Sequence, residues 1–146
     1  MRLMMKASLV RGIAFVLVGL FAVLGPAAAG NVPTAWDGAY EYGNGQDPVP
    51  FRIDVTVSGT SIQGTIVEVQ TFGDDIIDGR LGARIWGTID GSSVRFTKVY
   101  DGTGGVSHSV AYNGTLAKYD DGSWVMFGTW STGGVSGGWF ATSAKD

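Results

Sequence analysis

Residues 49–69 read VPFRIDVTVSGTSIQGTIVEV, and their pattern indicates the fold class. Apolar and polar residues alternate on both sides of the SGT link at 58–60. Successive side chains of a β-strand point to opposite faces, so alternation with a period of two gives a strand one apolar face. A short, glycine-containing link between two such runs is typical of a β-hairpin. We therefore predict two antiparallel strands, over 49–58 and 61–71.

The same alternation recurs in short runs along the chain, and no stretch has the apolar spacing of a helix. We predict strands over 35–42, 49–58, 61–71, 80–90, 92–101, 106–117, 123–131 and 135–143. Strands joined by short links usually pair with their sequence neighbours. A meander of this length can close on itself and leave no free sheet edge. The expected fold class is all-β: an eight-stranded antiparallel up-and-down meander barrel formed by residues 30–146 as a single domain.

The period of two also separates an apolar face from a polar face. We expect the apolar face to point into the barrel, and its main members are Trp36, Tyr40, Ile53, Val55, Ile66, Ile85, Phe96, Val110, Leu116, Met126 and Phe140. The opposite face carries charged side chains such as Arg52, Asp54 and Arg95. A membrane barrel has the reverse arrangement, with apolar residues outside. We therefore expect no membrane partner once the leader described below is removed.

Glycines recur inside the predicted strands, on the face that points inward. They are Gly38, Gly64, Gly87, Gly114, Gly128 and Gly138. In a small barrel, glycine relieves sharp curvature, and this recurrence favours closure. The pair Asn113-Gly114 is also typical of a type I′ hairpin turn, which would split the sixth strand. We favour an unbroken strand because Gly114 fits the glycine pattern.

Part of the outward face is apolar, on the later strands. Its members are Trp86, Val99, Val125, Phe127, Trp139 and Ala141. Contiguous apolar patches on a surface often mark interfaces. We predict contacts between copies of the chain through Val99, Val125, Phe127 and Trp139, while scattered surface aromatics are the alternative interpretation.

Residues 1–29 have the pattern of a secretory signal peptide. Arg2 and Lys6 precede the apolar run at 13–24, and small residues follow at 27–29. The run is about 12 residues long, whereas a membrane-spanning helix needs roughly 20. We expect a signal helix that is cleaved after Ala29, and an exported protein in the periplasm or outside the cell.

Composition limits the possible chemistry of the 146-residue chain. It has no cysteine, which excludes disulfides and thiolate metal sites, and its net charge of −3 disfavours nucleic-acid binding. His108 is the single histidine, and neither G-x-S-x-G nor H-E-x-x-H occurs. We expect no catalytic activity, no metal and no cofactor.

Polar and aromatic side chains of the inward face gather where odd strands end and even strands begin. The predicted ligand-binding residues are Tyr42, Phe51, Glu68, Lys98, Tyr100, His108, Tyr112 and Trp130. An apolar pocket with a few convergent polar groups is the usual form of a ligand site. We expect a small apolar or amphipathic ligand at this mouth. In the alternative, a Glu68–Lys98 bridge closes a filled barrel. The protein would then be an inhibitor or envelope assembly component acting through loops 43–48, 72–79 and 102–105.

Short motifs along residues 30–146 resemble the small bacterial lipocalin-like and avidin-like barrels of the calycin group. The motifs are WDGAY at 36–40, VRFTKVY at 94–100, HSVAYNG at 108–114, GTW at 128–130 and GGWF at 137–140. Thr34 stands where the lipocalin G-x-W motif has glycine. The resemblance implies a barrel that binds a small apolar or amphipathic molecule at its mouth.

Overall fold

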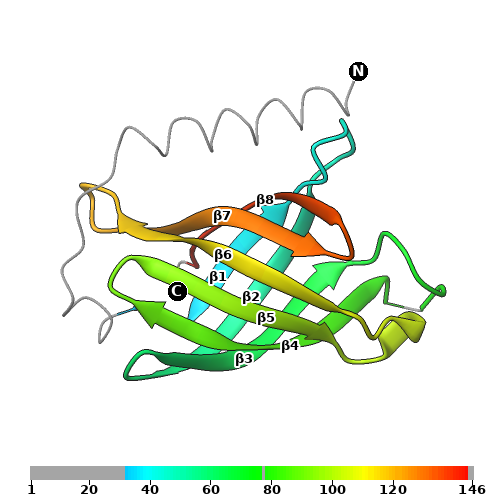
Figure 1. The fold of residues 1–146 in the computed structure, drawn as a ribbon, viewed down its shortest axis with the longest axis horizontal. Coiled ribbons are helices and arrows are strands. Elements are labelled where there is room, and N and C mark those ends of the chain that lie inside the picture. The colour runs from blue at the N-terminus through cyan, green and yellow to red at the C-terminus, as the bar shows by residue number, and fades with distance from the viewer. Residues whose placement is uncertain (1–31, 77, 145–146) are drawn as a thin grey trace.

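A computed structural model describes residues 32–76 and 78–144. Within these residues, eight antiparallel strands form a closed barrel in the order β1 to β8 (Figure 1). The strands are β1 Ala35–Tyr40, β2 Val49–Ser58, β3 Ser61–Val69, β4 Arg80–Asp90, β5 Ser93–Tyr100, β6 Ser109–Lys118, β7 Trp124–Thr132 and β8 Val135–Ser143. The predicted meander barrel is confirmed. The predicted signal peptide lies outside the described residues.

Each strand pairs with its sequence neighbours, and β1 pairs with β8 to close the barrel. The β2–β3 hairpin places Ile53 opposite Ile66 and Phe51 opposite Glu68. β6 is unbroken through Asn113, which pairs with Arg95 of β5 and Thr129 of β7. The interpretation of Asn113-Gly114 as part of a continuous strand is therefore correct.

The sixth strand begins at Ser109, whereas we predicted from the sequence that it begins at 106. A short 3₁₀ helix, η2 Thr103–Gly105, occupies the link after β5. Gly102, Gly104 and Gly105 there all have positive φ, which glycine adopts without strain and which a strand does not allow. The chain therefore turns within this link before β6 starts.

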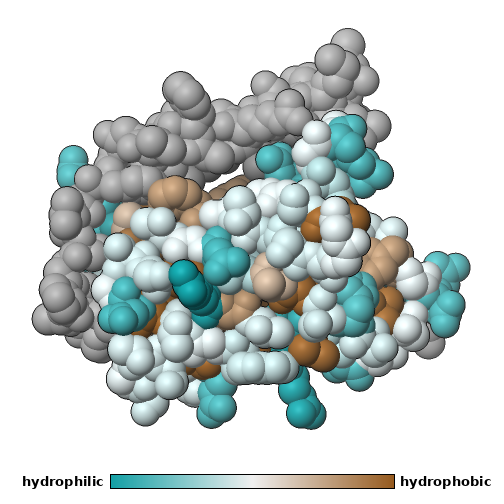
Figure 2. Space-filling view, in the orientation of Figure 1, coloured by the Kyte–Doolittle hydropathy of each residue, from teal (hydrophilic) through white to brown (hydrophobic). Residues whose placement is uncertain are grey.

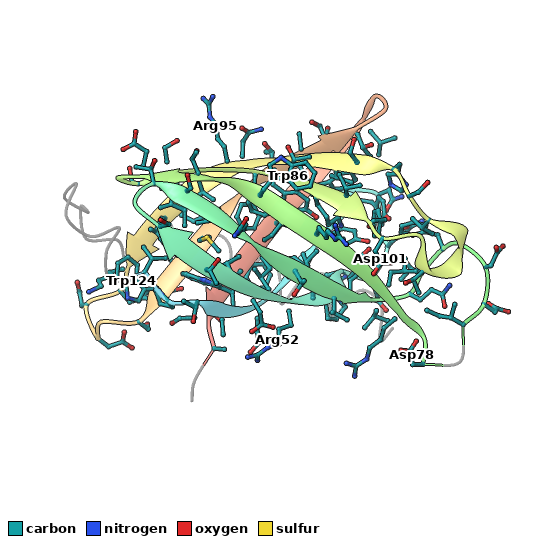
Figure 3. The ribbon with its side chains drawn as sticks, turned by 90° about the horizontal axis from the view of Figure 1, so that it is seen from below. Arg52, Asp78, Trp86, Arg95, Asp101 and Trp124 are labelled. Atoms are coloured by element: carbon teal, nitrogen blue, oxygen red, sulfur yellow. The ribbon has the colours of Figure 1, made fainter. Side chains whose placement is uncertain are left out.

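The inward and outward faces follow the predicted alternation along most strands. Buried and exposed residues alternate through β2, with Phe51, Ile53 and Val55 buried. Arg52 and Arg95 project away from the barrel (Figure 3). The face seen in Figure 2 is mostly hydrophilic or weakly polar, with small apolar areas. No helix in the described part of the chain is long and apolar enough to cross a membrane.

β8 has the opposite facing from the one predicted. Trp139 and Ala141 lie inside the barrel, whereas Phe140 is only partly buried and sits outside the main core. Trp139 packs against Phe96 and Tyr112, with ring centroids 5.5 Å away in both cases. Two large apolar residues are adjacent in this strand, so a period of two fits either of them. Trp139 occupies the interior, where its ring contacts other rings and its indole N–H donates to two backbone carbonyls.

The inward glycines are confirmed except on β8, where Gly137 takes the place predicted for Gly138. A Cβ on Gly137 would collide with the carbonyl oxygen of Glu41 and with the Trp130 indole. A Cβ on Gly128 would collide in the same way with the backbone at Asn113. These glycines allow neighbouring strands to approach closely where the sheet curves.

Two of the residues predicted to form a contact between copies of the chain are buried in the structure. Trp139 is inside the barrel, and Val125 is fully buried in a small cluster with Ala117, Tyr119 and Phe127. The prediction that Trp139 faces outward is therefore wrong. Val99 and Phe127 remain partly exposed.

Candidate functional site

A cavity of about 220 Å³ lies at one end of the barrel. It is lined by Tyr40, Tyr42, Phe72, Lys98, Tyr100, His108, Val110, Tyr112, Trp130, Thr132 and Val135. These residues come from the ends of β1, β5 and β7, the starts of β6 and β8, and the β1–β2, β3–β4 and β5–β6 links. In Figure 3 this end, the mouth, is the one that holds Asp78 and Asp101, while Trp124 marks the opposite end.

The floor of the cavity is a buried network of charged and phenolic groups. Lys98 Nζ donates to Glu68 Oε2 at 3.1 Å and to the Tyr100 hydroxyl at 2.9 Å. The Tyr100 hydroxyl in turn donates to Glu68 Oε1. Lys98 and Glu68 are 1% and 2% exposed. Either charge would be costly without the other, so the pair must be read as one unit.

Three phenol rings surround the Lys98 ammonium. Nζ lies 4.4 Å from the ring centroid of Tyr100, 4.9 Å from that of Tyr40 and 5.4 Å from that of Tyr112. A cation within about 6 Å of an aromatic face is attracted by the negative potential of the ring. The rings therefore supply part of the stabilisation that water would give to an exposed ammonium.

Burial changes the ionisation of this cluster. It lowers the pKa of Lys98, while the Glu68 carboxylate opposes that change. Burial also raises the pKa of Tyr40, Tyr100 and Tyr112, and the Glu68 charge adds to the rise. The phenols are thus held neutral and remain hydrogen-bond donors at physiological pH.

One donor at the cavity wall lacks a hydrogen bond. The Tyr40 hydroxyl is buried and has no partner among the described residues. Weak side-chain hydrogen bonding with Tyr42 adds to the raised pKa of Tyr40, and hydrogen bonding with Tyr40 acts on the pKa of Tyr100, but neither contact has the geometry of a full hydrogen bond. A buried polar group without a partner is uncommon and calls for an explanation.

The walls above the floor are mainly aromatic. Trp130 meets the rings of Tyr42 and Tyr40 edge to face, with centroids 5.4 and 5.8 Å away. Its indole N–H donates to the Glu41 carbonyl at 3.0 Å, which fixes the ring at the rim. On the other side, the exposed His108 ring lies 4.8 Å from the Tyr100 ring.

A loop brings Phe72 over the same opening. Its ring lies 5.7 Å from the Tyr100 ring and 5.9 Å from the His108 ring. The Gln70 side-chain amide donates to the carbonyls of Phe72 and Asp74, and the Asp74 N–H donates to the Gly104 carbonyl. The β3–β4 loop is thereby joined to the link that contains η2, and both form one side of the rim.

Most of the predicted ligand-binding residues meet at this cavity. Tyr42, Lys98, Tyr100, His108, Tyr112 and Trp130 line it. Glu68 lies behind Lys98 and Tyr100 as their hydrogen-bond partner, and Phe51 stacks on Tyr40 with ring centroids 6.5 Å apart. Neither of them is among the residues that line the cavity.

Sequence reasoning missed other lining residues. Tyr40, Val110, Thr132 and Val135 lie on or next to predicted strands, and Phe72 lies in a predicted loop. Tyr40 and Val110 were on the predicted inward face. Their positions near the strand ends at the mouth could therefore have identified them as lining residues. Nothing in the alternation indicated that the Phe72 loop folds over the opening.

A second, larger hollow lies on the outer wall of β2, β3 and β4. Its volume is about 720 Å³, and its lining includes Asp54, Gln63, Arg84 and Trp86. Trp86 is 50% exposed. Unlike the mouth, this hollow lies outside the barrel and has no buried ionic network.

Among the described residues, no group of three or more His, Asp or Glu side chains is placed to hold a metal ion. Comparison with known proteins returned no match to a family, to a curated protein or to a solved structure. The arrangement at the mouth therefore has to be interpreted from its own chemistry.

Proposed function

We propose that this is an exported binding protein that holds one small apolar or amphipathic molecule in the mouth of its barrel. The observation that carries the proposal is the 220 Å³ cavity, with aromatic walls above the buried Lys98–Glu68–Tyr100 network. An eight-stranded barrel is just wide enough to be filled or to hold one small ligand. Here the Glu68–Lys98 bridge fills the floor, and the space above it is open.

Chemistry at the cavity supports binding of an amphipathic molecule. The rings of Trp130, Tyr42 and Phe72 offer apolar surface to the body of a ligand, and aromatic surface contributes strongly to such contacts. Lys98 and the phenols offer donors to a polar end. A mostly apolar lining with a few polar groups is the common pattern of ligand pockets.

The test is native mass spectrometry of the protein purified from its own host. We expect a chain that begins after Ala29 and carries a retained small molecule, which organic extraction then releases. Stability gives a second reading, because a ligand at 100 times its Kd adds about 2.7 kcal/mol to the free energy of unfolding.

A matched pair of variants makes the test specific for the mouth. Val135 lines the cavity and is 50% exposed, while Val69 is 46% exposed and is not among the cavity-lining residues. Val135→Trp should obstruct the opening and abolish retention, and Val69→Trp should retain the molecule. Equal retention by both variants would contradict a site at the mouth. A co-purifying protein in place of a small molecule would favour an interaction role of the rim loops.

A further inference from the structure

The Lys98 ammonium has a donor that the protein does not use. An ammonium group carries three N–H donors. Glu68 Oε2 and the Tyr100 hydroxyl accept two of them. Among the described residues Lys98 Nζ makes no third hydrogen bond, and Lys98 lines the cavity. One strong donor is therefore available to an occupant of the cavity.

A second unused donor stands beside the first. The Tyr40 hydroxyl is buried without a partner, and the Tyr40 ring lies 4.9 Å from Lys98 Nζ. Both residues line the same cavity. A buried donor left without an acceptor costs free energy, and an acceptor supplied by a ligand would recover it. One oxygen acceptor that reached both groups would satisfy them together.

The charge at the floor decides what kind of oxygen fits. Glu68 already balances Lys98, and both are buried. A ligand carboxylate would add a second negative charge near Glu68 in a region of low dielectric, where like charges repel strongly. The effect of Glu68 on the pKa of Tyr40 indicates that its field reaches the place where the ligand oxygen would sit. An uncharged acceptor avoids this repulsion.

We propose that the bound molecule enters with an uncharged oxygen acceptor first, such as a ketone or aldehyde carbonyl, which accepts hydrogen bonds from the Tyr40 hydroxyl and the Lys98 ammonium. This inference rests on the proposed binding role and adds the chemical class of the ligand. The cavity is smaller than a typical drug-sized pocket, so the ligand body is about the size of a fused pair of rings. Trp130, Tyr42 and Phe72 would contact that body.

Three probes of matched size test the proposal. They are 2-acetylnaphthalene, with a neutral carbonyl; 2-naphthoate, with a carboxylate; and 2-isopropylnaphthalene, with no acceptor. Binding is measured by calorimetry and by the shift in thermal unfolding at pH 7. We expect the ketone to bind about tenfold more tightly than the hydrocarbon, as for one hydrogen bond to a charged group. The carboxylate should bind more weakly than the ketone.

The variant Tyr40→Phe tests whether the Tyr40 hydroxyl donates to the carbonyl oxygen of the ligand. It should reduce the advantage of the ketone over the hydrocarbon several-fold and leave the unliganded protein folded. Tyr119→Phe makes the same chemical change in the β6–β7 turn at the opposite end, and should change none of the affinities.

The outcomes separate this inference from the proposed function. If the carboxylate or the hydrocarbon binds as tightly as the ketone, the neutral-acceptor proposal is wrong, while the binding role stands. If Tyr40→Phe leaves the ketone advantage intact, the assignment to Tyr40 is wrong. If none of the probes binds and Val135→Trp changes nothing in protein from the host, both proposals fail.

Discussion

The interior of the barrel is built differently at its two ends. At the mouth, an ammonium, a carboxylate and several phenols lie beside an open cavity. At the opposite end, the interior is filled by aliphatic side chains such as Ile62, Ile89, Val94 and Leu116, all buried. Both ends follow the same alternation along the same strands. Strand pattern therefore specifies the barrel, while the choice of inward residues specifies what each end can do.

The two ends of the barrel contribute differently to stability. Burying an aliphatic side chain such as Leu116 stabilises a protein by about 1.5–3 kcal/mol. A buried ion pair such as Lys98–Glu68 stabilises little compared with apolar residues of the same size. The aliphatic side chains of the filled end thus stabilise the fold more than the buried ion pair does. The mouth holds the polar groups on which the proposed binding role rests.

Breaking the ion pair should have the largest effect. Lys98→Met leaves the Glu68 carboxylate buried without its cation, and we expect the free energy of unfolding to fall by about 3–5 kcal/mol. Urea unfolding at pH 7 measures it. The double variant Lys98→Met/Glu68→Leu should regain most of the loss, because it removes both charges. A single variant as stable as the original protein would mean that the buried network does not form.

A truncation at the filled end should cost stability without affecting the mouth. Leu116 is 1% exposed, and Leu116→Ala should lower the free energy of unfolding by about 2–5 kcal/mol. The affinity for 2-acetylnaphthalene should not change, provided it is measured well below the lowered unfolding temperature. A large loss of affinity would show that the two ends are coupled.

Raising the pH above 10 should lower the free energy of unfolding through the buried tyrosines of the mouth. The pKa values of Tyr40, Tyr100 and Tyr112 are raised in the folded protein, so their stabilising effect is present below pH 10 and is lost as pH rises above it. Each such tyrosine should remove about 1.4 kcal/mol per pH unit. Lys98 acts oppositely: its lowered pKa makes its contribution more favourable as pH rises towards its unfolded value of about 10.4.

Urea titrations between pH 9 and 11.5 test this slope. Tyr100→Phe should make the decline above pH 10 shallower by the share of one tyrosine. Stability that does not change over this range in the original protein would contradict the burial of the phenols.

A substitution on the outer wall should change the free energy of unfolding least. Trp86 is half exposed on β4, and Trp86→Ser should change the free energy of unfolding by no more than about 0.5 kcal/mol. Thermal unfolding of the variant checks this. A loss comparable to that of Leu116→Ala would imply that the 720 Å³ outer hollow has a structural role.

Sequence reasoning worked best where polar and apolar residues alternate strictly. β2 alternates without ambiguity, and its ends were predicted to the residue. It failed at β8, where Trp139 and Phe140 are adjacent and only contacts with Phe96 and Tyr112 select the inward ring. Period alone cannot decide between neighbours that are both apolar.

The candidate site, like the fold, was predictable only where strand alternation and strand direction determine it. Lys98, Tyr100 and Trp130 were placed at the mouth because strand direction brings their positions to one rim. Phe72 was not, because its place depends on hydrogen bonds from Gln70 and to Gly104, which have no sequence period. The unpartnered Tyr40 hydroxyl is a property of three-dimensional geometry and leaves no trace in the sequence.

Binding at the mouth can be observed through the indole N–H signals of the tryptophans in a ¹H–¹⁵N spectrum during titration with 2-acetylnaphthalene. Trp130 lines the cavity, Trp36 is buried at the opposite end, and Trp86 is on the outer wall. We expect the Trp130 signal to shift in a saturable way while those of Trp36 and Trp86 stay in place. A saturable shift of Trp86 with a stationary Trp130 would contradict binding at the mouth.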